Sequence, residues 1–133
     1  MKPRKDEIMS IQYFNHESFY QHTQDHKPVV VMYSANWCSF CRNLTSSYHD
    51  LANKYDQEFR MGVVNVDLYP TLEQAADIKY LPTFILYQNG KELGRIVNPP
   101  NIDTVELFIT EHVHIISDAE LKAFESFQAL IFS

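Results

Sequence analysis

Cysteine is scarce in this chain of 133 residues: there are only two, Cys38 and Cys41, three positions apart. A secreted disulfide scaffold carries more cysteines, spread along the chain, so this class is excluded. The longest apolar run is about six residues, whereas a membrane-spanning helix needs about 20. No apolar stretch of signal-peptide length follows the charged residues 1–7. We therefore expect a cytoplasmic protein with no membrane partner and a flexible N-terminus at 1–7.

Basic side chains are outnumbered, because Lys and Arg total 11, Asp and Glu total 17, and the net charge is −6. Nucleic acids and anionic lipids bind basic faces, so neither is expected as a partner. Hydrophobic residues nonetheless make up 45% of the chain, which is too many for a disordered protein. At this length they predict one domain that folds without disulfide or metal support.

Strands and helices are predicted to alternate and then to end in a hairpin. Residues 29–34 form a continuous apolar and β-branched run, typical of a strand buried on both faces. Asn89-Gly90 lies between two strand-like runs and predicts a tight turn, because both turn residues need a positive φ. The pattern predicts an α/β fold whose mixed sheet is parallel at first, antiparallel at the end, and covered by helices on both faces. We expect strands at 9–14, 29–34, 61–67, 83–88 and 91–97, and helices at 16–24, 39–59, 69–78, 102–113 and from 117.

The predicted helix at 39–59 is marked by one apolar stripe that repeats every three or four residues. Other helices are marked by their ends: Asn15 and Asn101 as N-caps, Pro70 in a first turn, and Ser117 with Glu120 as a capping box. The stripe consists of Phe40, Leu44, Tyr48, Leu51, Tyr55 and Phe59.

The two cysteines lie between the strand at 29–34 and this long helix. Cys38 would lie at the first helical turn, where free N–H groups and the helix dipole favour a thiolate. Cys41 lies three residues further on, on the same side of the helix and more enclosed, so the two sulfurs can form a reversible disulfide. Lowering the pKa of a thiol by about 1.5 speeds its attack on a disulfide only about 3-fold. The larger gains are that Cys38 becomes a better leaving group and that Cys41 is already in place as the second thiol.

Four segments together resemble the thioredoxin family. The resemblance extends without a gap over 29–98 and more loosely over 8–114, with residues 115–133 as a C-terminal helical extension. It implies a thioredoxin fold with a central five-stranded sheet, and a protein-disulfide reductase that needs no cofactor and no metal. The matching segments are Trp37-Cys38-Ser39-Phe40-Cys41, Val64-Asn65-Val66-Asp67, Leu81-Pro82-Thr83-Phe84 and Asn89-Gly90.

The same resemblance implies roles for individual residues. Cys38 would be the nucleophile and Cys41 the resolving thiol, with Ser39 and Phe40 influencing the redox potential. The Leu81–Pro82 bond would be cis, and the Leu81 backbone would pair with a substrate strand beside Trp37. Asp67 would hydrogen-bond the Trp37 indole. Partners would be disulfide-containing proteins and an upstream reductase resembling thioredoxin reductase.

Several positions depart from the family pattern. The buried Asp on the strand before the motif is replaced by Met32, and its accompanying Lys by Val63. Met cannot take a proton from Cys41, so another group must do so. The groove Gly after the hairpin is replaced by Asn98, whereas the Lys after the second cysteine becomes Arg42, which keeps the charge. The usual Gly-Pro pair is Ser39-Phe40, which suggests a more oxidising protein.

Other interpretations of the two cysteines fit the sequence less well. A purely structural role for Cys38 and Cys41 would not explain the adjacent Trp37 or the position of the two cysteines between a strand and a helix. A zinc site needs four ligands, and no second Cys or His pair has matching spacing. Glutaredoxin-like iron–sulfur binding is disfavoured by Trp37 and the N-terminal strand and helix. Two alternatives stay open: an interaction module with weak redox activity, suggested by Met32, Val63 and Asn98, and an oxidase or isomerase resembling a protein disulfide isomerase domain.

Residues 115–133 extend past the usual family length. We expect an extra helix packed on the domain of a monomer, and as an alternative a helix that docks a partner or a second copy.

Overall fold

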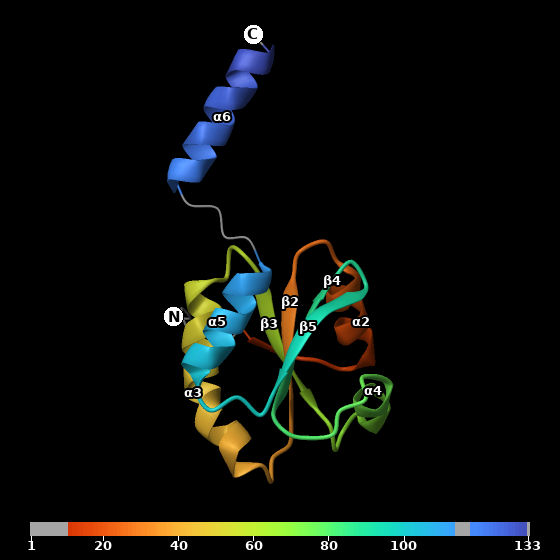
Figure 1. The fold of residues 1–133 in the computed structure, drawn as a ribbon. Helices are drawn as coiled ribbons and strands as arrows, with labels where there is room; N and C mark the ends of the chain where they lie inside the picture. The colour runs from red at the N-terminus through yellow and green to blue at the C-terminus, as the bar shows by residue number, and fades with distance from the viewer. Residues whose placement is uncertain (1–10, 114–117, 133) are drawn as a thin grey trace, which may run out of the picture.

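The computed structural model describes residues 11–113 and 118–132, and its centre is one mixed sheet (Figure 1). Strand β1 pairs parallel to β3, and β3 parallel to β2. Strand β4 runs antiparallel to both β2 and β5. This is the predicted sheet, parallel at first and antiparallel at the end. Its order is β1-β3-β2-β4-β5, with β1 at Ile11–Tyr13, β2 at Val29–Ser34, β3 at Arg60–Asn65, β4 at Thr83–Gln88 and β5 at Lys91–Val97.

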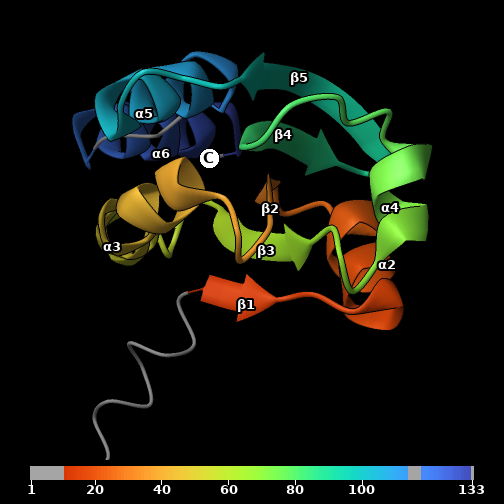
Figure 2. The same ribbon diagram turned by 90° about the horizontal axis from the view of Figure 1, so that it is seen from below.

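Helices cover both faces of the sheet (Figure 2). On one face lie α3 (Ser39–Lys54) and α5 (Ile102–His112), which contribute Leu44, Tyr48 and Phe108 to a large core. On the other face lie α2 (His16–Gln24) and the short α4 (Pro70–Ala75), which pack Phe19 and Leu72 against a smaller core. The predicted three-layer arrangement is confirmed.

Strand β2 lies at the centre of the sheet, between β3 and β4. Val29, Val31 and Tyr33 point into the core under α2 and α4, and Val30 and Met32 into the core under α3 and α5. All five are at most 2% exposed. The continuous apolar run at 29–34 therefore marks a strand buried on both faces, as predicted.

Short-range signals at turns and helix starts are confirmed. Asn89 and Gly90 have φ of 54° and 79°, which the predicted two-residue turn requires. The Asn15 side chain accepts from the Ser18 N–H at 2.8 Å and the Asn101 side chain from the Thr104 N–H at 2.9 Å. Pro70 lies in the first turn of α4.

The predicted end of the long helix is wrong. Helix α3 ends at Lys54 with Tyr55 as its C-cap, not at 59. Phe59 is buried, and its ring stacks on Tyr55 with centroids 5.1 Å apart. The apolar spacing continues past the helix because Phe59 reaches the same core from a turn.

Other predicted bounds shift by a few residues. Helix α4 ends at Ala75, before the predicted 78, and Asp77 has a φ of 56° that a helix cannot continue through. Strand β3 covers 60–65 rather than 61–67, and α5 ends at His112 rather than 113. Strand β1 covers 11–13 of the predicted 9–14. The predictions for residues 1–7, for 9 and 10, and for a cap at Ser117 lie outside the described residues.

Helix α6 (Asp118–Phe132) is present, as predicted, but it stands away from the sheet in Figure 1. The side chains of Phe127, Leu130 and Ile131 are 58%, 79% and 56% exposed. The exposure of these three side chains differs from the prediction of a helix packed on the domain. Among the described residues, no helix is both long and apolar enough to cross a membrane.

Helix α3 is fixed to the sheet by the Tyr48 hydroxyl. It donates to the Val30 carbonyl at 3.1 Å and the Gly62 carbonyl at 2.8 Å, so one side chain joins α3 to β2 and β3. Burial raises the pKa of Tyr48, so this hydroxyl stays a neutral donor.

We predict that Tyr48→Phe lowers the free energy of unfolding by about 1–2 kcal/mol, because two buried carbonyls lose their donor. Urea unfolding followed by circular dichroism measures the change. Tyr20→Phe is the matched control, since Tyr20 is 65% exposed, and it should leave stability unchanged. Equal stability of Tyr48→Phe and the parent chain would show that this bond does not hold α3 in place.

A chain that lacks residues 117–133 should keep its melting temperature to within about 2 °C, because Phe127, Leu130 and Ile131 of α6 are exposed. Calorimetry measures this, with the full chain as the control. A drop of several degrees would show that α6 packs on the domain in solution.

Candidate active site

The two cysteines lie where strand β2 passes into helix α3. Cys38 is the N-cap residue of α3, and its Sγ accepts a hydrogen bond from the Cys41 N–H at 3.1 Å. The Cys38 N–H in turn donates to the Ala35 carbonyl at 3.1 Å, which closes the loop between strand and helix. The predicted position at the first helical turn is confirmed.

Cys38 and Cys41 form a disulfide, with their Cα atoms 5.3 Å apart. The two sulfurs differ in access, since Cys38 is 8% exposed and Cys41 only 1%. Once the bond is reduced, an outside disulfide can reach Cys38 more readily than Cys41. This asymmetry suits a nucleophile and a resolving thiol.

The electrostatic environment of the pair favours a thiolate at Cys38. The first turn of α3 contains no acidic residue, and its free N–H groups and dipole point towards the Cys38 sulfur. Arg42 adds a positive charge one residue after Cys41. Its Nη1 donates to the Asn36 carbonyl at 2.5 Å, so the guanidinium is held beside the loop.

The cis-proline loop lies at the same end of the sheet as the cysteines. The Leu81–Pro82 bond is cis, as predicted. Tyr33 near the end of β2 pairs with Thr83 at the start of β4, which brings Pro82 to the edge where the loop to Cys38 begins. Pro82 is buried and its carbonyl accepts from the Asn98 N–H at 2.8 Å. Trp37 is 68% exposed at the same edge.

The remaining predicted residues lie around the pair in different ways. Ser39 is exposed, whereas Phe40 packs partly against the core under α3 and α5. Asp67 is exposed, and its N–H donates to Asn65 Oδ1 at 2.9 Å. Within residues 11–113 and 118–132, no hydrogen bond joins the Asp67 carboxylate to the Trp37 indole. A supporting role for Asp67 stays a prediction.

Met32 and Val63 lie side by side in the core under α3 and α5. They are paired in register between β2 and β3, and they are 2% and 7% exposed. Neither side chain can accept or donate a proton. The proton that Cys41 must lose therefore goes to another acceptor.

Sequence reasoning missed two contacts that hold the site. The Thr45 hydroxyl donates to the Cys41 carbonyl at 3.1 Å, and a hydroxyl four residues after a cysteine in a helix could have suggested this bond. Asn65 Nδ2 donates to Asn36 Oδ1 at 3.4 Å and links the loops after β2 and β3. This second contact has no local signal, since 29 residues separate the partners.

No group of three or more His, Cys, Asp or Glu side chains in the described part of the chain could hold a metal ion. Cys38 and Cys41 are bonded to each other and leave no free cysteine as a ligand.

Comparisons with known proteins agree with this geometry. A family model described as Thioredoxin matches residues 10–111. A thioredoxin of Mus musculus is 34% identical over 88 residues, which cover 65% of this chain and 80% of the relative. A thioredoxin of Griffithsia pacifica is 31% identical over 90 residues, which cover 67% and 83%. The thioredoxin structure from Nicotiana alata matches with a TM-score of 0.71 and 25% identity, covering 79% of this chain and 94% of that one.

We predict that the reduced protein reacts with iodoacetamide at Cys38 well before Cys41, because Cys38 is the more exposed sulfur and lies at the helix start. Mass spectrometry of peptides after timed quenching measures both sites. In guanidinium chloride the two rates should become similar, which is the control. Equal rates in the folded protein would contradict the assignment of Cys38 as nucleophile.

Proposed function

The chain belongs to the thioredoxin family, and on this premise we propose that it reduces disulfide bonds in protein substrates through Cys38 and Cys41. Thiol–disulfide oxidoreductase activity follows from the family and the cysteine pair. The direction of the reaction and the class of substrate are the proposal. The observation that carries it is the disulfide whose outer sulfur belongs to the N-cap of α3.

Reduction takes two exchange steps. In the first, the Cys38 thiolate attacks one sulfur of the substrate disulfide, and the other substrate sulfur leaves as a thiolate. In the second, Cys41 gives up its proton and attacks the Cys38 sulfur, which breaks the mixed disulfide and releases the second substrate thiolate. The substrate gains two electrons, and the Cys38–Cys41 disulfide is formed. A reducing partner must then return two electrons to the pair.

Cys41 contributes most to the second step. In that step the Cys38 sulfur is attacked and the substrate sulfur leaves as a thiolate. Cys41 already lies within bonding distance of the Cys38 sulfur, which makes its attack intramolecular. This effect outweighs the gain in initial attack, which is about 3-fold for a Cys38 pKa lowered by about 1.5.

Substrate proteins would dock at the edge formed by Trp37, Leu81 and Pro82. Trp37 offers an exposed aromatic surface next to Cys38. The Leu81 backbone forms no hydrogen bond to another backbone group among residues 11–113 and 118–132. It is therefore available to pair with an extended substrate segment that carries the disulfide.

An interaction module with weak redox activity is a second candidate. The apolar pair of Met32 and Val63 favours it, because no titratable side chain there takes the Cys41 proton. A module of this kind would hold its partner through non-covalent contacts and not through a mixed disulfide. A disulfide oxidase or isomerase, an upstream reductase as partner and a cytoplasmic location stay predictions.

We predict that Cys38→Ser abolishes reduction of insulin disulfides, because no nucleophile remains at the helix start. Turbidity of precipitating insulin with dithiothreitol as reductant measures the rate. Cys41→Ser should instead accumulate a mixed disulfide with insulin, visible on a non-reducing gel and removed by excess dithiothreitol.

The module interpretation predicts a different outcome. The parent chain would then reduce insulin hardly faster than dithiothreitol alone, while Cys38→Ser would still capture the same partners as the parent. Ser39→Ala serves as the matched control, since it changes an exposed hydroxyl in the same turn and leaves both thiols intact.

A further inference from the structure

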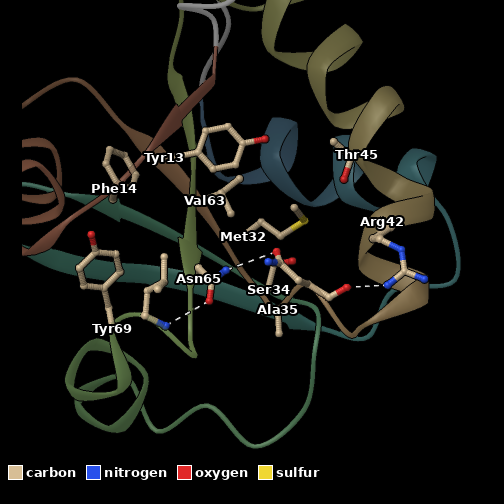
Figure 3. Close-up of a pocket in the computed structure, with 12 residues that line it drawn as sticks. Tyr13, Phe14, Met32, Ser34, Ala35, Arg42, Thr45, Val63, Asn65 and Tyr69 are labelled. Atoms are coloured by element: carbon tan, nitrogen blue, oxygen red, sulfur yellow. Dashed lines mark hydrogen bonds between the residues drawn. The ribbon is translucent and has the colours of Figure 1, made fainter.

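A pocket of about 250 Å³ opens at the carboxyl ends of the parallel strands, beside the first turns of α3 (Figure 3). Tyr13 at the end of β1 lies at one edge of it. Asn65 at the end of β3 lies at another, and Arg42 and Thr45 project from α3 on the far side. Asn36 after β2 also lines the pocket and is hydrogen-bonded to Asn65. Trp37, Leu81 and Pro82 are not among its described lining residues, so it is separate from the proposed substrate edge.

The connections of the strands explain why a pocket forms here. Strand β2 continues into α3 on one face of the sheet, whereas its neighbour β3 continues into α4 on the other face. Two adjacent parallel strands whose connections leave in opposite directions open a crevice at their carboxyl ends. In α/β proteins this crevice is where ligands bind.

The inner wall of the pocket is apolar. Met32 and Val63 lie at its centre in Figure 3, with Phe14 and Tyr69 on one side. Leu68 adds an aliphatic side chain that is 69% exposed at the rim. Where the family pattern has an acid and a lysine, this chain has Met32 and Val63. The pocket therefore offers a surface that accepts a hydrocarbon group.

The polar rim carries one positive charge. Among the described residues that line the pocket, Arg42 is the only charged one. Its Nη1 is held by the Asn36 carbonyl, and no carboxylate of residues 11–113 pairs with it. The other guanidinium N–H groups can therefore receive an anion. Asn36, Asn65 and the hydroxyl of Ser34 add neutral hydrogen-bonding groups next to it.

We propose that this pocket binds a small carboxylate with an apolar body, its carboxylate on Arg42 and its body against Met32 and Val63. An engineered apolar cavity of about 150 Å³ holds benzene, so 250 Å³ has room for one ring and a short acid arm. Pockets for drug-sized ligands run from about 300 to 1,000 Å³, so this smaller pocket is too small for a dinucleotide. A cation is excluded because the described lining offers no carboxylate.

Phenylacetate is the probe, followed by two-dimensional amide NMR of the full, oxidised chain. We expect saturable shifts confined to amides around the pocket, such as Asn36, Arg42 and Asn65. Phenylacetamide, which has the same shape and no charge, should bind at least about fivefold more weakly. Binding is read from shifts, so the result is independent of the proposed reductase activity.

Two variants and a control test the contacts. Arg42→Gln should weaken phenylacetate binding at least about fivefold, and Leu68→Ala should weaken both probes, because it removes part of the apolar wall. Arg60→Gln is the control, since this exposed arginine begins β3 at the opposite end of the strand, and it should bind like the parent.

Three outcomes would overturn the proposal: shifts scattered over the surface, shifts that do not saturate, or equal binding by Arg42→Gln and the parent. Both variants change exposed side chains, and their amide spectra without ligand report whether the fold is kept.

Discussion

From Val29 to Tyr33 the side chains of strand β2 are buried on both faces of the sheet, and Val29, Val30, Val31 and Tyr33 are 0% exposed. A strand of this kind needs a neighbour on each edge and a helix layer over each face. Strands β3 and β4 satisfy its backbone, and two pairs of helices cover its side chains. The point where β2 ends is therefore held from every side, and the cysteine loop begins there.

The chemistry of the site depends on this position. Because α3 starts directly after β2, its free N–H groups face the Cys38 sulfur while Cys41 is enclosed against the core. The same strand places Met32, which cannot accept a proton, in the core under α3 and α5. The rigid end of β2 thus makes thiol exchange at Cys38 favourable and leaves the deprotonation of Cys41 to another group. It also forms one wall of the pocket beside Arg42.

Sequence reasoning succeeded where a signal is local and failed where distant contacts decide. The caps at Asn15 and Asn101 and the turn at Asn89-Gly90 depend only on residues at most three positions away in the chain. The structure confirms all three predictions. Phe59 continued the helical spacing of α3 although the helix had ended, because a turn can bring a side chain to the same core as a helix. Packing of α6 was expected from its apolar residues alone, yet nothing in those residues specifies a matching surface.

The sequence by itself determined the five strands, the helix that follows β2 and the pairing of Cys38 with Cys41, because periodicity, turn chemistry and a three-residue spacing act over short stretches of chain. It could not determine the bond between Asn36 and Asn65 or the pocket that Arg42 and Met32 share. These arise only when β2 and β3 pair in register and their loops leave the sheet on opposite faces. Contacts between residues far apart in the chain depend on that register, which no local pattern encodes, so only the tertiary structure decided them.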